Sequence, residues 1–333
     1  MLTILPSLEQ TAADDTAGAR GIPTTLQELE TAAAALRTAR GVAVCLVGVI
    51  SAAARSMLSD NTKLRKLPDG SAVINAGVTL APSKRSGILN VCPHATAGCI
   101  AACVLWFAGR TVTATVRRAA IARTKLWAFF PEVFYARLDR ALQALERRAR
   151  KLGVRAFCRL NVASDIDHPL DVVTDHPAIT FYDYSKSVDR CDRYARGEMP
   201  ANYHCSYSLS EKSTFDDVSR LLDAGVNVVI VFHSHYFGPR HRYGVLPAAV
   251  TFTAGPSGMI GPTVPVVDGD VHDLRVPEFD GRGFVIGLRL KGGTVAKSRA
   301  LAHGFARTWS AAAEKEYRVG ELVREGLAVV ELK

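Results

Sequence analysis

The sequence contains no long hydrophobic run. Its longest strongly apolar stretch, Gly41 to Ala54, has 14 residues, whereas a helix that crosses a bilayer needs about 20. The N-terminus also lacks the basic segment followed by apolar residues that marks a secretory signal. These absences argue against a membrane protein and predict a soluble protein of the cytoplasm.

Three common catalytic signatures are absent as well. The sequence has no G-x-x-x-x-G-K-[ST] phosphate loop, no G-x-S-x-G nucleophile turn and no H-E-x-x-H zinc helix. The enzyme classes that carry these motifs are therefore excluded. Disulfides are not expected either, because an odd number of cysteines, seven, in a chain without a secretory signal does not suit a disulfide framework.

The chain has ample apolar material for a folded core. Of its 333 residues 48% are hydrophobic and 8% are aromatic, which excludes a disordered chain. The length allows a single α/β barrel or two domains. We expect an N-terminal arm and helical extension over residues 1–60, a cysteine-loop α/β barrel domain over 61–295, and a C-terminal helix and closing segment over 296–333.

The apolar pattern predicts strands separated by helices. Helical periodicity covers Thr25–Arg40, Thr111–Phe130, Glu132–Leu152 and Phe215–Ala224. Segments typical of strands are Ala72–Leu80, Ala156–Ala163, Ile179–Tyr184, His204–Ser208, Val226–His233, Val264–Val267 and Phe284–Leu290. Seven strands without tight hairpins favour a mainly parallel sheet, and so a full or incomplete (β/α) barrel.

Polar residues follow five of these expected strands. They are Ser164 to Asp167, Asp183 to Lys186, Ser208 to Glu211, His233 to His235 and Asp268 to Asp270. In a (β/α) barrel such positions meet at one mouth, where reactive residues collect. The candidate catalytic residues, for proton transfer or cation binding, are Asp165, Asp183, Lys186 and Asp270. Turn formation and core packing are the structural alternatives for these side chains.

Three cysteines stand close together in one loop, Cys92, Cys99 and Cys103, with the spacing C-x6-C-x3-C. Zinc sites usually present paired C-x2-4-C elements, and only one close pair is present here. Three thiolates on one loop suit a [4Fe–4S] cluster better, with its fourth iron open or bound elsewhere. Zinc is the alternative metal, Cys205 is the candidate fourth ligand, and three buried structural thiols are the alternative to any metal.

Positive charge is concentrated in one segment. The whole chain carries 41 Lys and Arg against 32 Asp and Glu, a net charge of +9, and residues 110–155 alone carry twelve basic and three acidic residues. A basic face of this kind suits phosphate-rich partners, most simply DNA or RNA. The candidate nucleic-acid contacts are Arg117, Arg118, Arg147 and Arg148. The alternative is an ordinary solvated helix surface.

The layout resembles that of the radical SAM enzymes. A first strand is followed by a three-cysteine loop, a helix and a run of β/α units, and this arrangement covers about residues 72–290. The usual cysteine spacing of that family is C-x3-C-x2-C. The resemblance implies that Cys92, Cys99 and Cys103 hold a [4Fe–4S] cluster whose open iron binds S-adenosylmethionine.

Several short motifs carry a second resemblance, over about residues 61–293. They are Leu80-Ala81-Pro82, Cys92-Pro93 to Cys103, Arg159-Leu160-Asn161, Ser164-Asp165-Ile166, Phe181 to Lys186, Asn202-Tyr203-His204, Gly269-Asp270 and Asp273-Leu274-Arg275. In these motifs the chain is similar to an uncharacterised family of actinobacteriophage and prophage proteins of the gene product 88 type. The resemblance implies a phage or mobile-element origin, and so the cytoplasm of a bacterial host.

Two functional hypotheses follow. The first is an iron–sulfur protein of phage origin with radical SAM-like chemistry on a nucleic acid or a nucleotide. The second is a nucleic-acid-binding or replication-associated phage protein whose iron–sulfur or zinc site is structural. The sequence alone leaves open whether the protein is an enzyme.

Overall fold

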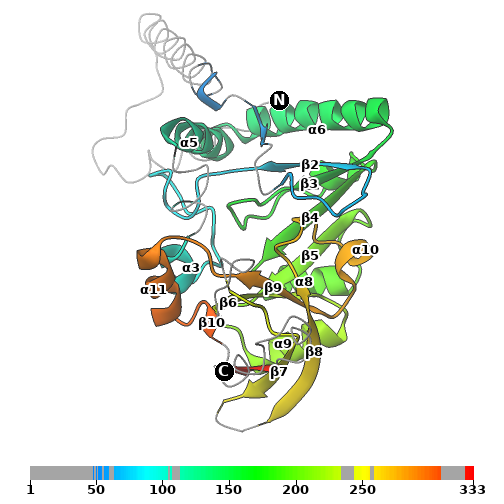
Figure 1. Ribbon diagram of the computed structural model, residues 1–333. Helices are drawn as coiled ribbons and strands as arrows, with labels where there is room; N and C mark the ends of the chain where they lie inside the picture. Colours follow the sequence, from blue (N-terminus) through cyan, green and yellow to red (C-terminus); the bar gives the residue numbers. More distant parts are fainter. Residues whose placement is uncertain are drawn as a thin grey trace, which may run out of the picture. The chain divides into compact units, whose positions relative to one another are not determined.

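Figure 1 shows the computed structural model of the chain. The structure describes residues 48, 50, 52–54, 56–59, 64–103, 106, 113–233, 244–255, 259–308 and 327–333. The chain divides into two units, Met1–Val49 and Ile50–Lys333, and the elements below all belong to the second. The helix expected at Thr25–Arg40, and most of the extension expected over residues 1–60, lie outside the described residues.

Eleven strands form one sheet in the described part of the chain. They are β1 (Leu58–Ser59), β2 (Val73–Val78), β3 (Arg155–Arg159), β4 (Ile179–Ser185), β5 (Tyr203–Ser208), β6 (Val228–His233), β7 (Ala249–Ala254), β8 (Ile260–Asp268), β9 (Val285–Arg289), β10 (Arg307–Thr308) and β11 (Leu327–Leu332). The strand order is β1-β2-β3-β4-β5-β6-β9-β8-β7-β11, and β10 pairs with β6. Seven neighbouring strands run parallel to one another, namely β2, β3, β4, β5, β6, β9 and β8. Strand β1 is antiparallel to β2, and β7 is antiparallel to β8.

All seven expected strands are found, and the mainly parallel α/β class is confirmed. Strands β2 to β6 lie side by side in sequence order, as successive β/α units do. The described sheet is open, because its end strands β1 and β11 do not pair with each other. Closure into a barrel therefore stays a prediction.

The described helices are α3 (Ala97–Ala101), α5 (Ala114–Phe129), α6 (Pro131–Leu152), α7 (Asp171–Thr174), α8 (Val188–Ala195), α9 (Phe215–Asp223), α10 (Pro277–Asp280) and α11 (Thr294–Ala302). Helix α6 follows its sequence pattern, since Pro131 opens it and Gly153 ends it in the left-handed conformation (φ 66°). Its apolar repeat, Phe134, Leu138 and Leu142, is buried in the core. No described helix has both the length and the hydrophobicity of a bilayer span.

The two faces of the sheet are covered differently. Successive side chains of β4 alternate between the faces, so Phe181 belongs to the large core that the helices α6, α8 and α9 share, while Tyr182 belongs to a smaller cluster. In that cluster Tyr182 packs with Phe157 of β3 and with Leu274 and Val276, which follow β8. Helices therefore cover one face, and the segment after β8 covers the other.

Candidate functional site

The cysteine loop, residues 92–103, lies at the carboxyl edge of the parallel sheet, where the segment after β3 contacts it. The backbone N–H of Asp165 donates to the carbonyl oxygen of Val91 (2.8 Å). The thiol of Cys92 donates to the carbonyl oxygen of Ala163 (3.5 Å). In parallel sheets this edge is where ligand sites form, so the loop stands in the position that the sequence predicts for reactive residues.

Glu211, three residues after β5, holds the other side of the loop. Its carboxylate accepts hydrogen bonds from Thr96 Oγ1 (2.7 Å) and from the backbone N–H of Gly98 (2.9 Å). Gly98 has no space for a side chain, because a Cβ there would stand 2.8 Å from Phe305 Cβ and 2.9 Å from His303 Cβ. The start of α3 is therefore fastened both to the end of β5 and to the segment after α11.

Cys92, Cys99 and Cys103 are all half-buried, and the charges of Cys99 and Cys103 act on Cys92. The pKa of Cys92 is raised to about 12, first by burial and then by the charges of Cys99, Cys103 and Asp165. The N–H of Ser83, 3.2 Å from the Cys92 sulfur, opposes this shift. Cys92 is thus within electrostatic reach of both other cysteines of the loop.

The donor set, rather than a ready-made geometry, fits a thiolate-bound metal. No group of three or more His, Cys, Asp and Glu side chains in the described residues is already arranged to hold a metal ion. Three cysteine sulfurs, one of them accepting a backbone N–H, are nevertheless the ligands that iron–sulfur and zinc sites use. A bound cation would also offset the repulsion that opposes ionisation of Cys92. The sulfur of Cys205 lies in the core, 3.7 Å from that of Cys191.

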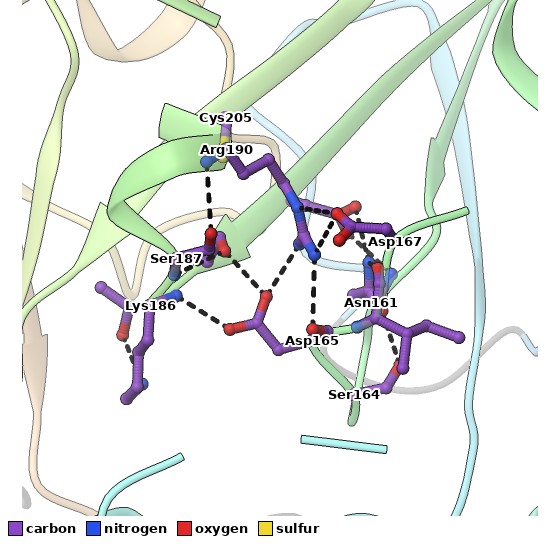
Figure 2. A network of polar contacts seen from close by, with 12 residues as sticks. Asn161, Ser164, Asp165, Asp167, Lys186, Ser187, Arg190 and Cys205 are labelled. Atoms are coloured by element: carbon purple, nitrogen blue, oxygen red, sulfur yellow. Dashed lines mark hydrogen bonds and ion pairs between the residues drawn. The ribbon is translucent and has the colours of Figure 1, made fainter. Parts of the chain in front are cut away.

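Asp165 is the centre of a polar network (Figure 2), and its backbone N–H bonds the residue just before the cysteine loop. Its Oδ1 accepts from Ser185 Oγ and from Arg190 Nη1, each at 2.8 Å, and its Oδ2 accepts from the N–H of Lys186 at 2.9 Å. Arg190 also donates from Nε to Asp167 (3.0 Å). Arg190 thus stands between the carboxylates of Asp165 and Asp167, and it ties the segment after β3 to α8.

Asp183 faces the helical layer and is fully buried. It accepts from the N–H of Asn161 (2.7 Å) and from the hydroxyl of Tyr203 (3.3 Å), and burial raises its pKa against the opposing charge of Arg190. Asp183, Arg190 and Tyr203 line a cavity of about 180 Å³ on this side. Asp183 is thus bound by both nitrogens of Asn161, and no hydrogen bond joins it to the cysteine loop in the described structure.

Asp270 belongs to a separate cluster at the ends of β8 and β9. Asp270 accepts from the backbone N–H of Arg289 (3.0 Å) and from the ammonium of Lys291. The guanidinium of Arg289 donates to both carboxylate oxygens of Asp268 (2.8 and 2.9 Å). Burial opposes ionisation of Asp270, but Lys291 and Arg289 lower its pKa. No hydrogen bond or ion pair joins Asp270 to Asp165 in the described residues.

Of the four candidate catalytic residues, only Asp165 and Lys186 are brought next to the cysteine loop. Two further residues that position the loop, Arg190 and Glu211, could not be identified from the sequence. Arg190 stands in an ordinary amphipathic helix, where nothing distinguishes it from a solvated arginine. Glu211 is visible in the sequence only as one of several polar residues after a strand. The residues Ser234 and His235 of another polar strand end lie outside the described residues.

The basic helices expose fewer arginines than the sequence suggests. Arg118 on α5 and Arg147 and Arg148 on α6 are exposed. The guanidinium of Arg117 lies instead 4.7 Å from the centre of the Trp106 ring and donates to the Trp106 carbonyl oxygen (2.9 Å). Arg117 therefore supports the fold locally, while the other three remain candidates for nucleic-acid contact.

Two more observations define this basic surface. Asp139 and Glu146 of α6 contact the buried ring of His176 (3.2 and 3.4 Å), which places part of the acidic charge of α6 against the neighbouring segment. Arg123 is buried and donates to the carbonyl oxygen of Thr79 (2.8 Å), so its charge does not reach the surface.

A buried ion cluster supports the face of the sheet opposite the helices. Arg275 and Asp280 are fully buried and joined at 2.8 Å. The hydroxyl of Tyr182 donates to the neighbouring Asp273 (3.1 Å). Burial raises the pKa of Asp280 to about 6, against the opposing charge of Arg275. The cluster fixes the segment after β8 to the sheet.

Comparison with known proteins gives one result. A family model described as gene product 88 matches residues 54–308, well over half of the chain. The match spans the sheet from β1 to β10 and includes the cysteine loop and the Asp165 network. Neither the curated proteins nor the solved structures contain a match.

Proposed function

The chain belongs to the Gene product 88 family, and we propose that it binds a [4Fe–4S] cluster through Cys92, Cys99 and Cys103 and acts on a nucleic acid or a nucleotide. The observation that supports the proposal is the position of the three-cysteine loop at the carboxyl edge of a parallel sheet, with Cys92 within electrostatic reach of both other cysteines. The open α/β sheet and its loop are compatible with a radical SAM-like incomplete barrel.

The residues of the chain position and tune this site. Glu211 fixes the helix that carries Cys99, and the Asp165–Arg190 pair fixes the segment beneath Cys92. The N–H of Ser83 would stabilise the ionised sulfur of Cys92, the form that binds a metal, against the burial that raises the pKa of this thiol. A cluster with one open iron would supply electron transfer to bound S-adenosylmethionine.

Anaerobic purification with iron, sulfide and zinc analysis tests the metal. We expect a brown protein with broad visible absorption and about four irons per chain. Cys99→Ser and Cys103→Ser should lose the metal and much of the soluble protein, because metal binding is coupled to folding. Cys45→Ser, in the apolar stretch Gly41 to Ala54 outside the cysteine loop, is the control and should keep the metal. A colourless, zinc-loaded wild type, or equal iron in all variants, would contradict the proposal.

Reaction with S-adenosylmethionine then separates an enzyme from a protein with a structural metal. We expect the reduced protein to bind S-adenosylmethionine and release 5′-deoxyadenosine. If neither occurs with a fully loaded cluster, the structural-metal hypothesis takes its place.

That second hypothesis, a nucleic-acid-binding phage protein, is favoured by one observation of its own. Helices α5 and α6 expose Arg118, Arg147 and Arg148. Contacts with the phosphate backbone would make binding depend steeply on salt, with a log–log slope of about −0.9 per neutralised phosphate on duplex DNA.

A titration of labelled single- and double-stranded DNA and RNA at two salt concentrations tests this surface. Replacing Arg118, Arg147 and Arg148 together with Gln should lower affinity and flatten the salt dependence. Arg299→Gln removes an exposed charge from α11 and serves as the control. If the wild type does not bind at ~50 mM salt, where phosphate contacts are strong, the basic surface is only a solvated face.

A further inference from the structure

Two cations stand beside the cysteine loop without a carboxylate bound to them in the described structure. The ammonium of Lys186 donates to the neutral Ser208 Oγ (2.8 Å) and lies 5.5 Å from the centre of the Phe305 ring. Arg307 donates to the carbonyl oxygen of Ser210 (3.5 Å), and its Nε is buried with no partner among the described residues. Both side chains are half-buried, so their charges are partly removed from water.

The nearest carboxylates do not satisfy these cations. Glu211 interacts with the charges of Lys186 and Arg307, but its two oxygens are bound to the start of α3. Glu331 of β11 acts on Arg307 from beyond ion-pair distance. Burial nevertheless outweighs both carboxylates and lowers the pKa of Arg307. The cation is therefore under-compensated, and an added anion would stabilise it.

We propose that Lys186, Ser208 and Arg307 bind a phosphate monoester on the substrate of the thiol site. Lys186 acts as a point charge, Ser208 as a hydroxyl donor and Arg307 as a forked donor, and together they suit a group with three terminal oxygens. Such a group carries a charge of about −1.5 to −2, which matches two cations, whereas a carboxylate carries one charge. The substrate class is a nucleoside monophosphate or a strand with a terminal phosphate.

The position suits a substrate of the thiol site, and in this respect the inference rests on the proposed function. Phe305, which lies beside Lys186, also packs against Gly98, the residue before Cys99. The N–H of Lys186 donates to Asp165, whose charge reaches Cys92. A phosphate held by Lys186 would thus anchor the substrate close to the three thiols.

Isothermal titration of the full chain with dAMP, deoxyadenosine, inorganic phosphate and acetate tests the site. We expect dAMP to bind at least about tenfold more tightly than deoxyadenosine, because charged hydrogen bonds contribute strongly. Lys186→Gln and Arg307→Gln should each weaken dAMP binding by about 10- to 100-fold. Arg307→Lys should weaken it less, since the charge remains, and the control Arg299→Gln should match the wild type.

Further measurements identify the source of the phosphate group and the results that would contradict the inference. An oligonucleotide with and without a 5′-phosphate shows whether the group comes from a mononucleotide or from a strand end. If Lys186→Gln does not fold, Ser208→Ala tests the same contact. Equal affinity for dAMP and deoxyadenosine, wild-type affinity in the Lys186 and Arg307 variants, or competition by acetate as strong as by phosphate would each overturn the inference.

Metal analysis of the same samples separates the two proposals. A protein that binds phosphate but no metal would refute the proposed function and leave the phosphate site standing. A protein that binds the cluster but has equal affinity for phosphorylated and unphosphorylated ligands would refute the phosphate site alone.

Discussion

Replacing Arg190 with methionine tests the ion pair that joins the end of β3 to α8. Arg190 is 3% exposed and Asp165 is 7% exposed, and they meet at 2.8 Å. Asp167, whose side chain is 75% exposed, adds little to the pair because water screens it. Removal of one partner of a buried pair leaves an uncompensated charge and costs about 3–5 kcal/mol. We expect Arg190→Met to lose a free energy of unfolding in this range.

Urea unfolding followed by circular dichroism measures this loss. The control is Arg193→Met, one turn further along α8, whose half-exposed side chain has no ion pair in the described residues, and it should cost below about 0.5 kcal/mol. Adding Asp165→Asn to Arg190→Met removes the orphaned charge, so the double variant should be more stable than the sum of the single effects by about 1–3 kcal/mol. If Arg190→Met costs no more than Arg193→Met, the pair does not fix this junction and the reasoning is wrong.

Two further predictions concern burial at single positions. Burial raises the folded-state pKa of Asp280 to about 6, so the stability that protonated Asp280 contributes is present below about pH 4 and is lost as the pH rises through 6. In urea titrations the wild type should therefore lose roughly 2–3 kcal/mol relative to Asp280→Asn between pH 4 and 7. A stability difference between the two proteins that does not change with pH would contradict this prediction. Gly98→Ala should cost about 1–3 kcal/mol in the same assay, because the added Cβ meets Phe305 Cβ at 2.8 Å, whereas Gly293→Ala, with nothing within 4 Å, should cost clearly less; equal costs would show that α3 does not depend on this close approach.

Features that depend on near neighbours along the chain could be predicted from the sequence. The bounds of α6 follow from Pro131, Gly153 and an apolar repeat, all of which act within a few residues. The seven parallel strands could be recognised because each is a short apolar segment between helices or loops. The cysteine loop could be recognised because its three thiols lie within twelve residues, so their meeting needs little tertiary information.

The contacts between polar groups of different elements could not be predicted in this way, because they depend on the three-dimensional fold. Asp165 pairs with an arginine 25 residues away, and Glu211 reaches Gly98 across 113 residues, distances over which no local pattern carries information. Asp183 points to the helical layer because successive side chains alternate along β4, and a shift of one residue would have turned it toward the other face. Local patterns predict elements, but the partner of a charge depends on strand order and register, which are set by the packing of the whole sheet.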